Sequence, residues 1–312
     1  MPTTLTAASV RPLLPARPGD AYKGTFGTLL AIAGSIIYPG AASLATAAAA
    51  RVGAGLVTLA VGRSALSGPG RIPEVVLRIL PEAEFGYLGE AAADELIPQL
   101  GSFGALLVGP GIGRDESTRG FITSLLGIRA SETGTMGFVP NIMQTPPRPR
   151  LPPVVIDADA LTLLAGVERW WERLPAGQAV LTPHLGEMAR LLGVPALTGD
   201  QCAIASEAAV RWRQVVVLKK GALTVIADPN GETVVHDRPN PALATAGTGD
   251  VLAGCIAGLL VQGATPYDAA RAGVHLHGQA GAMAAAELGD AGVLASDLLP
   301  LLPRALKALK QH

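Results

Sequence analysis

Short, uninterrupted runs of apolar residues recur along this chain between alanine-rich stretches, and this pattern constrains the fold most strongly. Most of the runs are bounded by Gly, Pro or Asp, as is typical of buried strands. Because the runs are continuous rather than alternating, both faces of the resulting sheet must be covered. The predicted strands are Thr28–Ala33, Leu56–Val61, Ala105–Val108, Val154–Ile156, Ala179–Leu181 and Val215–Leu218. The pattern predicts an α/β protein with a largely parallel sheet.

Two further runs, Leu223–Ala227 and Glu232–His236, flank the turn sequence Asp228-Pro229-Asn230-Gly231 and predict an antiparallel hairpin on this sheet. Helices are predicted at Ala41–Val52, Tyr87–Leu100, Ser117–Leu126, Leu185–Leu192, Asp200–Trp212, Gly249–Gln262 and Pro266–Leu288, the last capped by Thr265. The proline-rich segment 130–153 has no periodicity. A segment of this kind is a lid, an interface arm or a flexible surface loop.

Charge and cysteine content exclude several classes of protein. Lys and Arg number 24 against 25 Asp and Glu, and no basic run is present, so we expect no nucleic-acid partner. Cys202 and Cys255 are too far apart in sequence for a CxxC motif, which suits a reducing compartment. The first twenty residues do not have the pattern of a signal peptide, and Arg51 interrupts the most apolar window. The expectation is a soluble cytoplasmic protein without a membrane partner.

The stretch from Asn240 to Gly254 carries the sharpest chemical signal. A glycine-rich turn opens directly into an apolar helix, so free amides and the positive end of the helix dipole favour an anion such as a phosphate. Asp250 falls in the first helical turn. A carboxylate beside a phosphate site is unfavourable unless it accepts a proton from an attacking hydroxyl or helps to hold a metal ion. The alternative is a simple helix start with glycines for close packing.

Two other predicted strands also end in polar or glycine-rich sequence. Gly109-Pro110-Gly111-Ile112-Gly113 follows the strand Ala105–Val108, where ligands commonly bind in α/β sheets. His184 follows Ala179–Leu181, and Glu187 lies three residues further, on the same face of the next helix. His184 is either a substrate contact or a structural histidine, and Glu187 either assists a magnesium ion or is a helix-start residue favoured by the dipole.

Six stretches together resemble a known family. Ala246-Gly247-Thr248-Gly249-Asp250 is similar to the anion-hole signature of the ribokinase-like superfamily, and the other stretches resemble its ADP- or ATP-dependent NAD(P)H-hydrate dehydratase branch. These are Lys23-Gly24-Thr25-Phe26-Gly27 running into Gly34-Ser35, Gly109 to Gly113, Asp157-Ala158-Asp159-Ala160-Leu161, Thr182-Pro183-His184-Leu185-Gly186-Glu187, and Lys220-Gly221-Ala222-Leu223-Thr224. They occur in the family's order from about Pro15 to Leu302. The chain departs from the family pattern at Tyr22, where His is usual, and at Ala246, where Gly is common.

The resemblance implies a single ribokinase-like domain over residues 1–312: a three-layer α/β/α fold with a mostly parallel sheet, an antiparallel hairpin and no separate lid. It implies a lyase that restores NADH or NADPH from the S form of the hydrated cofactors NADHX and NADPHX, with ADP or ATP as co-substrate and Mg²⁺ as cofactor. Asp250 is then the catalytic base. Ala41 or Ala42, Gly111 and His184, with Asp250, bind the substrate, and Glu187 assists the metal through water. Lys220, Gly221, Ala222, Leu223, Thr224, Gly247, Thr248 and Gly249 bind the nucleotide. Adjacent Lys219 leaves open which ammonium faces it.

Alternatives from other classes share these residues. A vitamin-precursor kinase would use the same Asp250 and release a stable phosphomonoester, and a nucleotide sensor would bind without turnover. The resemblance also implies a homo-oligomer, a tetramer in relatives. Because no epimerase domain precedes Lys23, we expect a separate NAD(P)HX epimerase to act as functional partner.

Overall fold

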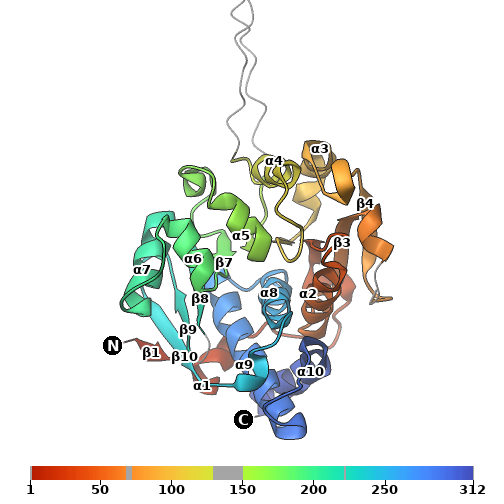
Figure 1. Cartoon of the computed structure of the whole chain (residues 1–312). Coiled ribbons are helices and arrows are strands. Elements are labelled where there is room, and N and C mark those ends of the chain that lie inside the picture. The colour runs from red at the N-terminus through yellow and green to blue at the C-terminus, as the bar shows by residue number, and fades with distance from the viewer. Residues whose placement is uncertain (1, 68–71, 129–149, 221–222, 312) are drawn as a thin grey trace, which may run out of the picture.

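Strands between Thr3 and Asp237 join in one sheet. The computed structural model describes residues 2–67, 72–128, 150–220 and 223–311, and these contain a ten-stranded sheet in the order β1-β10-β9-β8-β7-β6-β5-β2-β3-β4 (Figure 1). The strands are β1 (Thr3–Thr4), β2 (Thr28–Ile32), β3 (Leu56–Gly62), β4 (Val76–Leu80), β5 (Ala105–Val108), β6 (Val154–Ile156), β7 (Ala179–Leu181), β8 (Val215–Lys220), β9 (Leu223–Ala227) and β10 (Thr233–Asp237). Most of the segment 130–153, expected to be a flexible loop, lies outside the described residues.

The pairing pattern confirms the predicted mixed sheet. Neighbours from β4 across to β8 pair in parallel, whereas β9 is antiparallel to both β8 and β10. The hairpin turn is closed by Asp228, whose Oδ1 accepts hydrogen bonds from the amides of Asn230 and Glu232, both at 2.9 Å. The second hairpin strand begins one residue later than predicted, at Thr233.

Ten α-helices are present among the described residues: α1 (Ala7–Val10), α2 (Pro39–Arg51), α3 (Glu90–Leu96), α4 (Glu116–Leu125), α5 (Ala158–Leu164), α6 (Leu185–Leu192), α7 (Gln201–Trp212), α8 (Thr248–Leu260), α9 (Pro266–Leu288) and α10 (Ala295–Gln311). The helix predicted over Tyr87–Leu100 is shorter, because Pro98 stands where the chain turns into a 3₁₀ segment, Ile97–Ser102. Thr265 caps α9 as predicted, accepting a hydrogen bond from the amide of Asp268.

Alternate residues along the inner strands enter two separate cores. Leu29 and Ala31 of β2 pack in the core that includes α2, α8, α9 and α10, whereas Leu30 and Ile32 pack with α3 to α7. The two groups of helices lie on opposite sides of the sheet (Figure 1). This is the expected three-layer α/β/α architecture. No helix in the described part of the chain combines the length and the apolar character needed to cross a membrane.

Helix α8 is central to the first core and lies very close to α2. A Cβ atom added at Gly254 would lie 2.1 Å from the carbonyl oxygen of Ala45, and one at Gly258 would lie 2.6 Å from that of Ala49. Small residues on both helices therefore let their backbones touch. This contact fixes where the N-terminus of α8 meets the sheet.

Candidate active site

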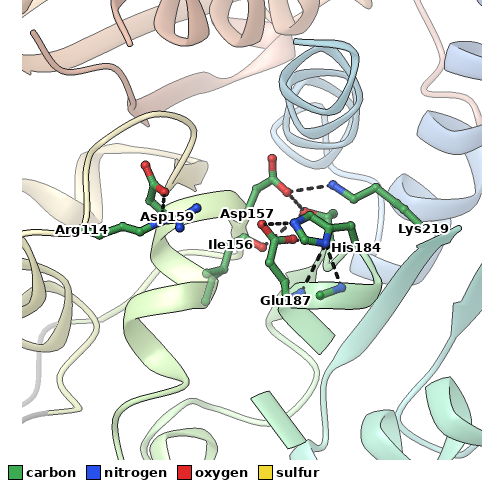
Figure 2. A network of polar contacts seen from close by, with 9 residues as sticks. Arg114, Ile156, Asp157, Asp159, His184, Glu187 and Lys219 are labelled. Atoms are coloured by element: carbon green, nitrogen blue, oxygen red, sulfur yellow. Dashed lines mark hydrogen bonds and ion pairs between the residues drawn. The ribbon is translucent and has the colours of Figure 1, made fainter. Parts of the chain in front are cut away.

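The loops that follow β5, β6 and β7, together with the end of β8, carry the polar residues of the site. Carboxyl ends of parallel strands share one edge of a sheet, which is where ligands bind in folds of this type. Figure 2 shows Asp157, His184 and Glu187 close together there, with Lys219 reaching toward Asp157 from β8. The N-terminus of α8 lies beside this group.

The start of α8 has the geometry of an anion site. Gly247 precedes the helix with φ of +90°, and a Cβ there would lie 2.6 Å from Leu44 Cδ1, so the turn requires glycine. The Thr248 hydroxyl donates to the carbonyl oxygens of Leu243 and Thr245, at 2.9 Å each, and holds the turn closed. Ala246 is not among the residues with positive φ, so its extra methyl group fits without backbone strain.

Asp250 lies in the first turn of α8, as predicted. Burial raises its pKa to about 7, and the charges of Asp157 and Asp159 act in the same direction, while Lys219 opposes them. A carboxylate with a pKa near neutrality is suited to accept a proton in catalysis. Asp250 therefore has the electrostatic setting of a general base.

The two aspartates after β6 have different partners. Asp157, only 2% exposed, accepts a hydrogen bond from the Thr182 hydroxyl and another from Lys219 Nζ at 3.1 Å. Asp159 binds the glycine loop instead, accepting from the amide of Gly113 at 3.0 Å and from Arg114 Nε at 2.6 Å (Figure 2). Asp157 thus organises the lysine side of the site, and Asp159 organises the loop after β5.

His184 and Glu187 bind each other. Both residues therefore have a structural role at the start of α6, one of the alternatives that the sequence left open for each. His184 Nδ1 accepts from the amides of Gly186 and Glu187 at the start of α6. Glu187 Oε2 accepts from the His184 amide at 2.9 Å, and its Oε1 lies 3.2 Å from His184 Nε2. Burial opposes ionisation of Glu187, but hydrogen bonds from His184 and the charge of Lys219 hold its pKa below the ordinary value. Both residues cap a helix, while 54% of the His184 side chain remains exposed.

The glycine loop after β5 packs against the start of α2. Gly111 has φ of +63°, and a Cβ there would lie 2.8 Å from the Cβ atoms of both Ala41 and Tyr38. Ala42 is buried and packs instead against Gly34. Of the two alanines considered from the sequence, Ala41 is the neighbour of Gly111.

A cavity of about 420 Å³ connects the hairpin to the start of α8. Its lining includes Lys219, Thr224, Thr248, Gly249, His236 and His277. Of the predicted nucleotide residues, Gly221 and Ala222 lie outside the described residues, and Leu223 pairs with Lys220 in the ladder. His236 and His277 were not predicted, because an isolated histidine in a strand or helix has no sequence signature. Lys219, the neighbour of the predicted Lys220, contributes to this cavity.

The site suits a magnesium ion that is held mainly by water and phosphate oxygens rather than by a cluster of protein ligands. No group of three or more His, Cys, Asp or Glu that could hold a metal exists among the described residues. Mg²⁺ in proteins commonly keeps several waters and binds substrate phosphates with one or two carboxylates. Asp157, Asp250 and Glu187 suit that mode, because the charge of Asp157 acts on Asp250 and the charge of Lys219 acts on both Asp250 and Glu187, without a closed cage of carboxylates among the described residues.

The sheet topology, the glycine turn and the partly buried Asp250 together define a ribokinase-like protein. The family model for NAD(P)H-hydrate dehydratase matches residues 29–304, and the chain belongs to this family. The bifunctional NAD(P)H-hydrate repair enzyme Nnr of Moorella thermoacetica is 42% identical over 311 residues, which cover 99% of this chain and 54% of that protein. The chain thus spans about half the length of such bifunctional relatives.

Single-function relatives match over most of their length. The ADP-dependent (S)-NAD(P)H-hydrate dehydratase of Bacillus subtilis is 33% identical over 305 residues, 97% of each chain. The crystal structure of the Bacillus subtilis ADP/ATP-dependent NAD(P)H-hydrate dehydratase, co-crystallised with ATP and Mg²⁺, superposes with a TM-score of 0.76 at 30% identity, covering 98% of both chains. These similarities agree with the resemblance inferred from the six sequence stretches.

Proposed function

We propose that this chain dehydrates the S form of hydrated NADH or NADPH, using ADP or ATP and releasing inorganic phosphate. The carrying observation is Asp250, held at the anion-binding start of α8 with a pKa of about 7. Family membership and the names of the single-function relatives support the choice of substrate. The proposed enzyme is a lyase that uses phosphoryl transfer to prepare the leaving group.

The reaction begins with proton acceptance by Asp250 from the hydroxyl group of the hydrated ring. The hydroxyl oxygen then attacks the terminal phosphorus of the nucleotide, and the bond from that phosphorus to the leaving AMP or ADP breaks. Amides at the start of α8, from Gly247 to Gly249, stabilise the charge on the phosphoryl oxygens. The ring nitrogen lone pair next expels the phosphate, and loss of a proton from the neighbouring carbon restores the dihydronicotinamide.

Magnesium, when bound, supplies positive charge to the phosphate oxygens. Glu187 would assist it through water, because both oxygens of Glu187 already interact with His184. The chain's own residues align the two substrates.

The same arrangement supports a proposal for the binding residues. Ala41, Gly111 and His184 contact the hydrated ring, whereas Ala42, being buried against Gly34, supports this pocket from behind. Lys220 to Thr224, with Gly247 to Gly249, bind the nucleotide. We further propose one domain over the whole chain, acting as a cytoplasmic homotetramer alongside a separate NAD(P)HX epimerase. The low charged fraction of 16% favours self-association.

One assay tests this function. The protein is mixed with the S form of hydrated NADH, Mg²⁺ and ADP, and near-ultraviolet absorbance and inorganic phosphate are followed together. The two signals should rise in step and require ADP or ATP. Neither signal would rise if the protein were a kinase for another substrate, and a sensor would bind nucleotide without releasing phosphate. Either result would overturn the proposal.

A further inference from the structure

Lys219 points to the same side of the sheet as the anion-binding helix. Along β8, Val215 and Val217 enter the core of α8 and α9, whereas Val216 and Leu218 enter the opposite core. Because side chains alternate along a strand, Lys219 continues the series of Val215 and Val217. Its amide donates to the carbonyl oxygen of Pro183 at 3.0 Å, which fixes the backbone at this point.

The Lys219 ammonium lies at the meeting point of the cavity and the start of α8. Its Nζ donates to Asp157 Oδ1 at 3.1 Å and lies 3.6 Å from the position that a Cβ of Gly249 would occupy. Lys219 also lines the 420 Å³ cavity together with Thr224 and Gly249. An ammonium has three donors, so the contact with Asp157 leaves two for a ligand. Only 21% of its side chain is exposed, so a contact formed here is partly shielded from water.

The charges around this position favour a cation that binds phosphate. Asp157, Asp250 and Glu187 bring negative charge to the neighbourhood of Lys219. These carboxylates repel a polyphosphate unless a positively charged group lies between them and the phosphates. Arg114 is paired with Asp159 on the loop after β5. Arg238 lines the cavity too, but it is the Lys219 ammonium that lies next to Gly249 at the start of α8.

We propose that Lys219 is a second catalytic residue, whose ammonium, oriented by Asp157, binds the phosphoryl oxygens of the nucleotide at the start of α8. This inference rests on the proposed function and deepens it. During transfer, Lys219 forms no covalent bond. It neutralises charge on the group that moves from the nucleotide to the hydroxyl oxygen, while Asp250 takes the proton.

Equilibrium binding separates this role from a structural one. ADP and adenosine are titrated into the wild-type protein and into Lys219→Met and Lys219→Arg, without hydrated cofactor. Lys219→Met should weaken ADP binding about 10- to 100-fold, the loss expected for a charge-assisted contact, and leave adenosine binding unchanged. Lys219→Arg should retain most of the ADP affinity. Arg78→Met, which removes a cation paired with Glu95 far from the site, is the matched control and should bind both ligands normally.

Turnover supplies the second measurement. Lys219→Met should lower kcat as well as raise the KM for ADP, because the contact strengthens as charge develops on the phosphoryl group. The role of Lys219 would be overturned if Lys219→Met weakened ADP and adenosine binding equally, or left ADP binding unchanged. It would also be overturned if Arg238→Met, and not Lys219→Met, weakened ADP binding. If hydrated NADH is not consumed by wild type but the ADP effect of Lys219→Met persists, only the proposed function fails. Thermal unfolding of each variant verifies that it folds.

Discussion

Asp250 is the residue whose chemistry can be tested most directly. Replacement by asparagine keeps its size and removes the proton acceptor. We expect Asp250→Asn to lower kcat by about 10²- to 10⁴-fold, the usual contribution of a general base, while ADP binding survives. Combined absorbance and phosphate assays measure the first effect, and calorimetric titration with ADP measures the second.

A control for this substitution exists in another helix. Asp268 occupies the first turn of α9 and pairs with Arg271, so Asp268→Asn removes a comparable helix-start carboxylate away from the site. It should leave kcat unchanged. Near-normal turnover by Asp250→Asn would show that another group accepts the proton.

If Asp250 is the base of the proposed reaction, its raised pKa should set the pH dependence of turnover. The base acts only when ionised, so at saturating nucleotide the rate should fall about tenfold per pH unit below a pKa of about 7 and reach a plateau above it. Asp157 raises this pKa, and it also holds Lys219. In Asp157→Asn the profile should therefore move to lower pH. A profile that stays at the wild-type position would contradict the electrostatic coupling.

Some residues of the site could be predicted from the sequence, and others could not. Asp250 and Gly247 were predictable, because a glycine turn and a helix start are local features. His184 and Glu187 were paired correctly by their spacing, but their capping contacts needed coordinates. The sequence alone could not favour Lys219 over its neighbour Lys220 as the lysine of the site. The residues of β8 that face α8 depend on how this strand packs in the sheet.

At the scale of elements, the contact between α2 and α8 determines the position of the anion site. Gly254→Ala places a Cβ 2.1 Å from the carbonyl oxygen of Ala45, so the helices must separate. We expect the free energy of unfolding to fall by about 1–3 kcal/mol, despite the better helix propensity of alanine. Because the start of α8 moves with the helix, ADP affinity should fall as well.

Gly101 provides the comparison, since a Cβ there would meet nothing within 4 Å. Gly101→Ala should change the free energy of unfolding by less than about 0.5 kcal/mol and leave ADP binding intact. Urea unfolding and ADP titration of both variants measure these effects. Equal stability of the two variants would show that the helices adjust without cost.

Elements of the interior were predicted from sequence better than those at the periphery. The strands from β5 to β7 match their predicted bounds, because buried strands are continuously apolar and end at Pro, Gly or Asp. Strand β4 was missed, since it lies at an edge of the sheet, where Val76 and Ile79 are exposed and the apolar signal is interrupted by Arg78. Helices α5 and α10 were missed as well: α5 is a single short segment directly after β6, and α10 contains Pro300 and Pro303.

Across the whole molecule, one sheet is shared by both cores. Strand β1 pairs with β10, so the first residues join the hairpin, and α10 packs on α9 and α2 in the core of α8. The order of strands follows from long-range pairing, such as β2 inserted between β5 and β3, which local sequence patterns do not encode. The sheet therefore couples segments that are distant in sequence.

This connectivity predicts a single cooperative unfolding transition. All three tryptophans, Trp170, Trp171 and Trp212, cluster beside α7, so their fluorescence reports on one core, whereas far-ultraviolet circular dichroism reports on every helix. The two urea curves should coincide, because neither core can lose the shared sheet alone. ADP at 100 times its Kd should raise the free energy of unfolding by about 2.7 kcal/mol in both curves equally, although its site is built on α8 and β8. An earlier fluorescence transition, or a shift by ADP of only one curve, would mean that the two layers unfold as separate units.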